Sequence, residues 1–350
     1  MNVFNFEAIT KVRLPPSHSG CLQSGVSGDE TLHANRAALK DCHLRPQRPV
    51  DVSTPDLSTT LLGEQFSSPV GLAPVCSQNV FHRDAEAAVA RAAKSQNHLQ
   101  ILSIQTKTPP DKVNEARGKP DWFQLCESNV FYRAQQRIKR AEEAGCPVPG
   151  VTVEPVGQRV PETRGILRRS DTRNCAMCHG GTMLQEKARF LPMYRDFDLT
   201  GVTNPMDPEM IWDKLGRLRD TTSMKVVVKG LLSGQDAAIA VRRGFDGIVV
   251  SNHGGRADEA GLVVIDALPE VIREVNGAVP VIVDSGFRRG ADIVKALCMG
   301  ADAVCVGRLY IRGLAVFGQK GVERVLQLLD AETMVMMRQT GANRREEPVP

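Results

Sequence analysis

Long apolar runs and a strong net charge are both absent from this sequence. No run approaches the roughly 18 apolar residues that a membrane-spanning helix needs, and the start of the chain lacks the apolar stretch of a secretory signal. The net charge of +4 is small for 350 residues, and the Lys and Arg residues are scattered, so the sequence does not indicate a nucleic-acid partner. We therefore expect a cytoplasmic protein with no membrane span.

The cysteines do not follow the pattern of a disulfide-stapled domain, because there are nine of them and they are spread along a long chain. Free thiols in a reducing compartment fit better. Cys175, Cys178 and His179 spell the haem c attachment motif CxxCH. Haem attachment generally needs an exported chain, and no further ligands are spaced to complete a zinc site. We therefore expect exposed or redox-sensitive thiols there, with no metal.

Eight short apolar segments alternate with helical patterns, which is typical of βα units on a parallel sheet. Apolar residues make up 42% of the sequence, enough to bury a core. Eight strands with helices between them predict an α/β fold, a closed (β/α)₈ TIM barrel. The expected strands are residues 69–74, 99–103, 122–126, 151–154, 226–229, 247–251, 279–284 and 303–307.

We expect a single domain over residues 1–350. Residues 1–66 are predicted to form an N-terminal helical cap over the N-terminal side of the barrel, beginning with a helix that ends near Leu14, and residues 67–330 to form the barrel. Residues 155–207 after the fourth strand are too long for an ordinary connection, and residues 208–220 are the expected helix. Active sites of such barrels lie at this end of the strands, so we interpret the excursion as a lid or entrance loop, with a disordered linker as the alternative. Residues 331–350 are expected to be a C-terminal tail.

Two strand ends carry residues suited to chemistry. Lys229 directly follows an apolar strand, where a cation could stabilise negative charge that develops on a bound ring, although a lysine that merely reaches solvent is common at such positions. His253 and Arg256 follow the next strand. A histidine suits proton abstraction and a guanidinium suits a carboxylate, so this pair predicts a base and a substrate anchor.

The last two strands end in glycines and arginines, in the segments DSGFRRG and VGR. This is the position at which many barrels bind phosphate through backbone N–H groups and cationic side chains. The pattern predicts a phosphate site but does not distinguish FMN from a sugar phosphate or a nucleotide.

The C-terminal third, with the segments DGIVVSNHGGR and VPVIVDSGFRRGADIVKALCMGADAVCVGR, resembles the FMN-dependent 2-hydroxy-acid oxidase and dehydrogenase family almost residue by residue. Segments of the N-terminal half, among them DETLHANRAAL, SSPVGLAP and DWFQL, are similar to the family in the same order. The resemblance covers about residues 3–341. It implies a TIM barrel, FMN as cofactor, a homo-oligomer and oxidation of a 2-hydroxy acid.

The resemblance assigns roles to individual residues. Lys229 would contact the flavin N1 and O2 atoms, His253 would be the catalytic base, and Arg256 would bind the substrate carboxylate. Glu154 would orient the base. The other matched positions would surround the FMN ribityl chain and phosphate or its ring: Asp284, Gly286, Arg288, Gly307 and Arg308, then Pro74, Val75, Cys76, Ser103, Gln124, Thr152 and Ser251.

The sequence also departs from the family pattern. Glu154 stands where the family usually has an aspartate, and Cys21 and Cys126 stand where it usually has tyrosines that hydrogen-bond the substrate. A further substrate-binding arginine would be Arg159 or Arg164, and the spacing does not decide between them. A thiol is shorter than a phenol and a weaker donor, so these changes bear on substrate choice.

The predicted function is oxidation of a 2-hydroxy acid to a 2-oxo acid. Oxygen as electron acceptor would make the protein an oxidase, whereas a quinone, cytochrome or partner protein would make it a dehydrogenase. The alternative is an FMN-binding relative with lost or altered catalysis, retained for redox sensing or as a scaffold.

Overall fold

Eight parallel strands form one barrel, as the alternating pattern predicts. In this computed structural model, residues 2–126, 129–154, 160–173, 190–202 and 207–344 are described. The strand order is β3-β10-β9-β8-β7-β6-β5-β4. A bridge between Leu72 and Gln100 joins the two ends, with Leu72 N–H donating to Leu99 O at 2.8 Å. The strands are β3 (Val70–Leu72), β4 (Ile101–Ser103), β5 (Trp122–Cys126), β6 (Pro149–Thr152), β7 (Val227–Leu231), β8 (Gly247–Val250), β9 (Val281–Val283) and β10 (Ala303–Val306).

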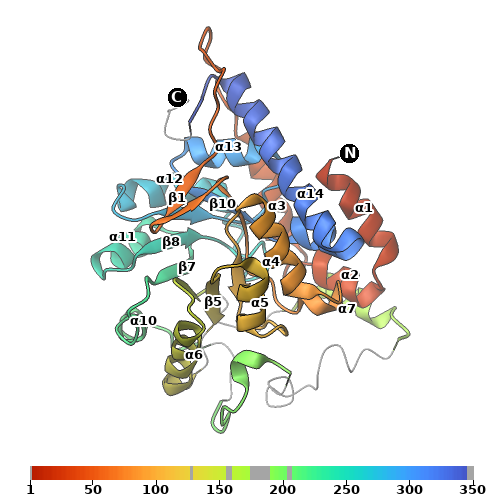
Figure 1. Ribbon diagram of the computed structural model, residues 1–350, viewed down its shortest axis with the longest axis vertical. Coiled ribbons are helices and arrows are strands. Elements are labelled where there is room, and N and C mark those ends of the chain that lie inside the picture. The colour runs from red at the N-terminus through yellow and green to blue at the C-terminus, as the bar shows by residue number, and fades with distance from the viewer. Residues whose placement is uncertain (1, 127–128, 155–159, 174–189, 203–206, 345–350) are drawn as a thin grey trace.

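The barrel is surrounded by helices that connect successive strands (Figure 1). The longest, α14, continues through residues 331–340, which the sequence pattern assigned to the tail. Its buried Thr333 and Met337 show why it continues: this part of the helix still packs against the body of the protein. The helices are α4 (Ala85–Gln96), α5 (Pro110–Arg117), α6 (Phe131–Glu143), α10 (Trp212–Arg219), α11 (Gly234–Arg242), α12 (Val264–Val275), α13 (Gly290–Cys298) and α14 (Arg308–Thr340).

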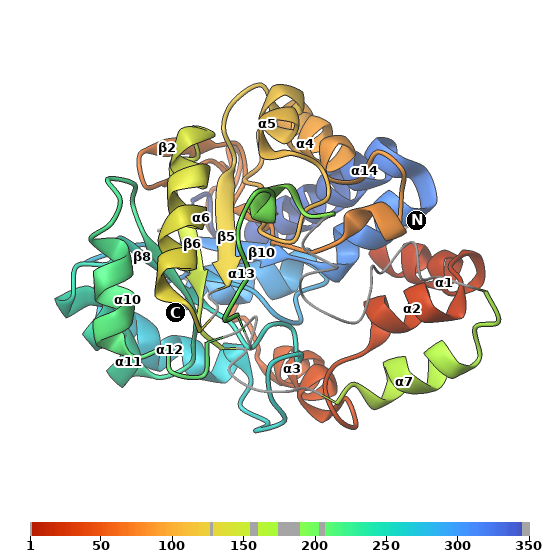
Figure 2. The same ribbon diagram turned by 90° about the horizontal axis from the view of Figure 1, so that it is seen from below.

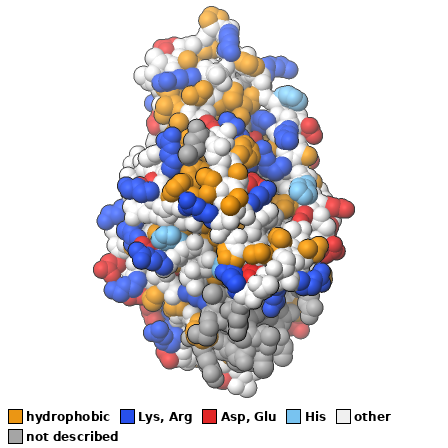
Figure 3. Space-filling view, turned by 90° about the vertical axis from the view of Figure 1, so that its right-hand side faces the viewer, with side chains coloured by type: hydrophobic (Ala, Val, Ile, Leu, Met, Phe, Trp, Pro, Cys, Tyr) orange, Lys and Arg blue, Asp and Glu red, His pale blue; other side chains and the backbone are white. Residues whose placement is uncertain are grey.

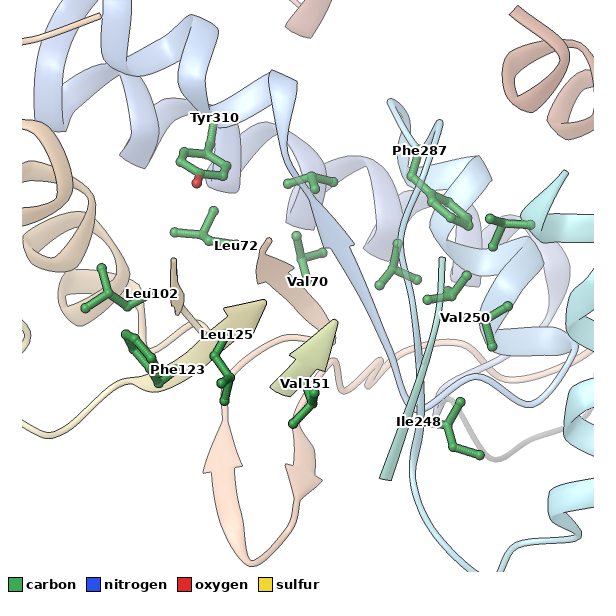
Figure 4. Packing of buried hydrophobic residues seen from close by; sticks show 14 of the residues in the cluster. Val70, Leu72, Leu102, Phe123, Leu125, Val151, Ile248, Val250, Phe287 and Tyr310 are labelled. Carbon is green, nitrogen blue, oxygen red and sulfur yellow. The ribbon is translucent and has the colours of Figure 1, made fainter. Parts of the chain in front are cut away.

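Side chains alternate between the two faces of each strand, as the pleat requires. In β5, Phe123 and Leu125 belong to the large apolar cluster between strands and helices, whereas Trp122 belongs to the smaller cluster inside the barrel. Figure 4 shows Tyr310 of α14 above Leu72 in the outer layer. The Tyr310 hydroxyl donates to Ala73 O at 2.9 Å. The same alternation decides which residues point into the barrel at its functional end.

The N-terminal segment is divided between the two ends of the barrel. The antiparallel hairpin of β1 (Thr59–Leu61) and β2 (Glu64–Phe66) places Leu61 and Phe66 in the apolar cluster inside the barrel, so it closes the N-terminal end. The prediction that the whole cap covers this end was wrong. The turn before α3 (Glu30–Asp41) meets the loop after β8, where Val26 N–H donates to Gly255 O at 3.0 Å.

Two more helices lie in the N-terminal segment. The predicted first helix is present as α1 (Val3–Arg13) and packs against α14. The second, α2 (Pro16–Gln23), packs against α7 (Glu162–Arg169) of the excursion, and the two lie side by side in Figure 2. The excursion also contributes the short helix η2 (Pro192–Tyr194), in which Met193 and Tyr194 are buried. Part of the excursion therefore packs as ordered structure, although residues 155–159, 174–189 and 203–206 lie outside the described ranges.

Among the helices described here, none is both long and apolar enough to cross a membrane. On the face drawn in Figure 3, Lys and Arg side chains are spread between apolar areas rather than gathered into one basic patch.

We expect Leu72→Ala to lower the free energy of unfolding by about 2 to 5 kcal/mol, because Leu72 is fully buried and its loss leaves a cavity. Ile211→Ala is the control, since that side chain is 62% exposed, and its effect should stay within about 0.5 kcal/mol. Denaturant titration of both variants measures the difference. Equal effects would contradict the assignment of Leu72 to the core.

Candidate functional site

The inward-facing rows of five strands change from an apolar to a polar side chain at their C-terminal ends. Since inward positions recur every second residue, the polar member lies two residues after the apolar one. The pairs are Ile101 and Ser103, Trp122 and Gln124, Val227 and Lys229, Val249 and Ser251, and Ile282 and Asp284. A polar layer therefore covers an apolar barrel interior, at the end where barrels of this kind place their active sites.

Glu154 joins two of the predicted catalytic residues. Lys229 Nζ donates to Glu154 Oε1 at 2.5 Å, and His253 Nδ1 lies 2.9 Å from the same oxygen. The second oxygen, Oε2, is buried and has no hydrogen-bond partner among the residues that the structure describes. Gly230 makes room for this long side chain, because a Cβ there would collide with the carboxylate. Glu154 therefore contacts the predicted base, as expected, and the same carboxylate oxygen also accepts from Lys229.

The ionisation of this group follows from its neighbours. Burial disfavours the charge on Glu154, but Lys229 and His253 outweigh burial and lower the pKa of the carboxyl to about 2. Burial also disfavours the charge on Lys229, yet Asp284 and Glu154 hold the pKa of its ammonium above the ordinary value. Both groups are therefore charged at neutral pH. An ionised carboxylate only accepts hydrogen bonds, so His253 Nδ1–H is the donor.

The Ser251 hydroxyl lies at the centre of a second set of contacts. It accepts from Lys229 Nζ at 2.7 Å and from His253 N–H at 3.0 Å, and it donates to Asp284 Oδ1 at 2.6 Å. Ser285 Oγ also donates to Asp284 Oδ1, at 2.7 Å, and accepts from Gly254 N–H at 2.9 Å. Ser285 was not predicted. These contacts connect the ends of β7, β8 and β9.

A row of neutral hydrogen-bonding groups lies across the neighbouring strands. Gln124 Nε2 donates to Thr152 Oγ1 at 2.9 Å and to Cys126 Sγ at 3.1 Å, and Ser103 Oγ donates to Gln124 Oε1 at 3.2 Å. Strand register explains the juxtaposition, since Ser103 pairs with Gln124 and Cys126 pairs with Thr152. Such amide and hydroxyl groups fit the polar edge of a flavin ring.

A small pocket lies between this polar layer and the barrel interior. Its lining is mostly apolar, and its rim carries an amide, an ammonium and a carboxylate, which could meet the edge of a bound ring. The lining residues are Pro74, Ile101, Trp122, Gln124, Gly150, Val227, Lys229, Val249, Asp284 and Cys305.

Arginines gather beside this pocket near the start of α14. Burial together with Arg312 and Arg36 lowers the pKa of the Arg288 guanidinium to about 9, and burial together with Arg256, Arg288 and Arg312 lowers that of Arg308. Burial is the main cause, and the neighbouring guanidinium groups add to it, so positive charge is concentrated here. A bound phosphate would place negative charge among these groups.

The backbone near these arginines also suits an anion. Helix α14 follows Gly307 directly and has no side-chain cap, so its first N–H groups can donate to a phosphate. Val75 lies next to Gly307: a Cβ atom added at Gly307 would be 3.7 Å from the Cγ2 atom of Val75. Gly286 has a φ of 89°, and its carbonyl accepts from Arg36 Nη1 at 2.7 Å. The residues present therefore fit an FMN: its phosphate would be held here, and its ring would contact the amide, hydroxyl and ammonium groups of the polar layer.

The two arginines of the predicted substrate and phosphate sites share a support. Arg256 Nη1 donates to Cys21 O at 3.0 Å and to Ser24 O at 2.7 Å. Arg308 Nη2 donates to the same Ser24 O at 2.9 Å, and its Nη1 donates to Gly254 O at 2.8 Å. The carbonyls at the C-terminal end of α2, which carry partial negative charge, thus hold both guanidinium groups.

Cys76 is exposed, and it lies close enough to Cys21, Arg256 and Arg164 for their charges to act on its thiol. Arg164 is on α7 beside Gly20, so this candidate arginine lies near the other site residues. Arg159, the other candidate, lies outside the described residues. The same holds for the CxxCH segment, residues 175–179.

Asn35 and Asn252 were missed by the sequence interpretation. They exchange two side-chain hydrogen bonds between α3 and the loop that carries His253. The available signal was the position of Asn35 in DETLHANRAAL, a segment that contributed to the family resemblance without a role of its own.

Comparisons with known proteins agree with this fold and with FMN as a ligand. The family described as FMN-dependent dehydrogenase matches residues 10–348. The L-lactate oxidase of Nostoc sp. is 35% identical, over 99% of this chain and 96% of its own. The 2-hydroxyacid oxidase 1 of Homo sapiens is 34% identical, over 96% of this chain and 92% of its own. A structure of mandelate oxidase with (S)-2-phenylpropionate has 30% identity and a TM-score of 0.85, and the match covers 98% of this chain and 95% of that one.

The family resemblance and the (β/α)₈ barrel are thus confirmed, the first by the family match and the second by both the strand topology and the solved relative. The chain belongs to the FMN-dependent dehydrogenase family, and FMN is its cofactor.

Proposed function

We propose that this protein oxidises a 2-hydroxy acid to the 2-oxo acid, with His253 as base and Arg256 as the anchor of the substrate carboxylate. The observation that carries the proposal is the contact of His253 Nδ1 with an ionised Glu154 at the C-terminal end of the barrel. The tautomer that donates through Nδ1 has its lone pair on Nε2, the atom that would take the proton of the substrate hydroxyl. Glu154 then stabilises the imidazolium that results.

Arg256 is pre-organised for its role. Its Nη1 atom is held by two carbonyls of α2, and the rest of its planar fork can bind a carboxylate with little further loss of freedom. Bound FMN supplies the ring that accepts a hydride equivalent from the substrate carbon. The Lys229 ammonium lies at the pocket rim, where it would stabilise negative charge on that ring.

The electron acceptor is proposed to be oxygen, in keeping with the names of the relatives, which are oxidases for lactate, 2-hydroxy acids and mandelate. The single-domain organisation, the cytoplasmic location and the homo-oligomer stay predictions. The alternative of an FMN protein without turnover has less support, because the base, its carboxylate and Lys229 are assembled in one connected group.

We expect Arg308→Gln to weaken FMN binding and to abolish the preference for FMN over riboflavin, which lacks the phosphate. Arg308→Glu should prevent FMN binding, because a carboxylate would then face the phosphate. Fluorescence titration of the apoprotein with both flavins measures the effect. Arg324→Glu, an exposed change on the same helix, is the control. Unchanged FMN affinity in folded Arg308→Gln would rule out the assigned phosphate site.

His253→Ala should leave FMN bound and slow flavin reduction by a 2-hydroxy acid on the order of 10²-fold or more, the usual scale for a positioned base. Anaerobic stopped-flow absorbance measures the limiting rate. The exposed His43 provides the matched control His43→Ala, which should behave like the wild type. Reduction at the wild-type rate in His253→Ala would remove this residue from the mechanism.

The two cysteines at the tyrosine positions should widen the pocket and weaken binding of small acids. Cys21→Tyr with Cys126→Tyr should therefore raise flavin reduction by glycolate or lactate and lower it for large aliphatic or aromatic hydroxy acids. Each hydrogen bond to a charged group contributes roughly 1.5 to 3 kcal/mol, which sets the size of the expected gain. Reduction rates for both substrate classes test it. A double variant with no gain on small acids would show that these cysteines do not set specificity.

A further inference from the structure

A buried pair of amides connects the N-terminal segment to the loop that carries His253. Asn35 Nδ2 donates to Asn252 Oδ1 at 3.0 Å, and Asn252 Nδ2 donates to Asn35 Oδ1 at 2.9 Å. Asn35 is 2% exposed and Asn252 is 1% exposed. The two residues are more than 200 positions apart, and they meet because α3 packs against α12, next to the loop after β8.

The same two amides also hold the backbone of the loop at both ends. Asn252 Oδ1 accepts from Gly255 N–H at 3.0 Å, and Asn252 Nδ2 donates to Leu262 O at 3.2 Å. Asn35 Oδ1 accepts from Val264 N–H at 3.4 Å. The pair therefore links α3 to the start of the loop after β8 and to its end, where α12 begins.

His253 follows Asn252 directly and adopts a strained backbone conformation. Its φ of 58° lies in the left-handed region, which residues other than glycine seldom occupy. Such a conformation persists only when its surroundings hold it. The Ser251 hydroxyl accepts from His253 N–H at 3.0 Å, and Asn252 O accepts from Gly255 N–H at 3.1 Å, so the peptide between Asn252 and His253 is held at both its N–H and its carbonyl. This backbone conformation accompanies the placement of the ring next to Glu154.

We propose that Asn35 is a positioning residue for the base: by fixing Asn252, it keeps His253 in the conformation that permits its contact with Glu154. The proposal rests on the proposed function of His253. Under this proposal, α3 affects the rate of the chemical step through the loop after β8, in addition to covering the barrel.

The attachment of α3 to the barrel does not depend on Asn35 alone. Arg36 pairs with Asp292 at 2.6 Å, and Lys295 Nζ donates to Leu39 O at 2.5 Å, so two other contacts fasten the same helix to α13. Lys295→Met is therefore a matched control, because it weakens the docking of α3 without touching the loop after β8.

The first experiment compares the FMN-loaded wild type, Asn35→Ala and Lys295→Met by anaerobic stopped-flow over a range of substrate concentrations. We expect Asn35→Ala to retain FMN and to lower the limiting rate of flavin reduction by about 10-fold to 100-fold, as misplacement of a catalytic group does. The half-saturating substrate concentration should change less than the limiting rate, because two carbonyls at the end of α2 hold the Arg256 guanidinium independently of Asn35. Lys295→Met should keep the wild-type rate. A limiting rate for Asn35→Ala equal to that of Lys295→Met would overturn the proposal.

A double-mutant cycle tests whether the two amides act as one unit. Asn35→Ala and Asn252→Ala remove the same pair, so the double variant should be no slower than the slower single variant. If the two losses multiply, the residues act independently and the proposed coupling is wrong.

Hydrogen exchange gives a readout that does not depend on turnover. In the FMN-loaded protein, backbone amides of residues 252–256 should exchange at least about 10-fold faster in Asn35→Ala than in Lys295→Met, since only the first change releases the loop. Equal exchange in the two variants would overturn the proposal whatever the activity. If exchange is faster in Asn35→Ala but no 2-hydroxy acid reduces the flavin of the wild type, the result would support the positioning role and refute the proposed function.

Discussion

An ionised carboxylate buried at the C-terminal end of the barrel joins the ends of three strands in one site. Glu154 follows β6, Lys229 lies in β7 and His253 follows β8, and a single oxygen of Glu154 contacts both other side chains. A buried charge is costly unless it is paired and hydrogen-bonded, so the carboxylate needs both partners, and the position of each partner depends on the parallel register of the strands. Thr152 pairs with Lys229 in that register, which places the chain after Thr152 next to the ammonium. The geometry of the proposed base thus depends on the barrel itself.

The N-terminal helices hold parts of the site that the strands do not fix. Carbonyls at the end of α2 hold Arg256 and Arg308, and the amide of Asn35 in α3 holds the loop around His253. Close approach makes this possible, since a Cβ on Gly255 would collide with the backbone of Leu32. The proposed substrate anchor, phosphate arginine and base are therefore supported by one segment that is remote from all three in sequence. A change in that segment can alter catalysis without touching the cofactor.

Much of the barrel could be predicted from local pattern, because each strand is a short apolar run and strands of this kind are read from a few neighbouring residues. All eight predicted segments overlap observed strands, and the expected helix near Leu14 is present. The β1–β2 hairpin was missed, since Leu61 and Phe66 give two weak signals whose partner is the barrel interior, far away in the sequence. The candidate site was recognised mainly through family resemblance. Residue types alone predicted a base, an anchor and a phosphate site, but they did not identify the cofactor.

The amino-acid sequence by itself determined the class of fold, the family, and the identity of the groups that can carry charge or protons. Those properties depend on local periodicity and on side-chain chemistry, which every residue carries with it. Only the tertiary structure decided that Glu154 serves Lys229 and His253 together, that α2 holds two arginines by its carbonyls, and that Asn35 meets Asn252. These contacts join residues tens to hundreds of positions apart, and their strength depends on burial and on distances of about 3 Å between particular atoms. Such distances arise from packing of the whole chain, which no local pattern contains.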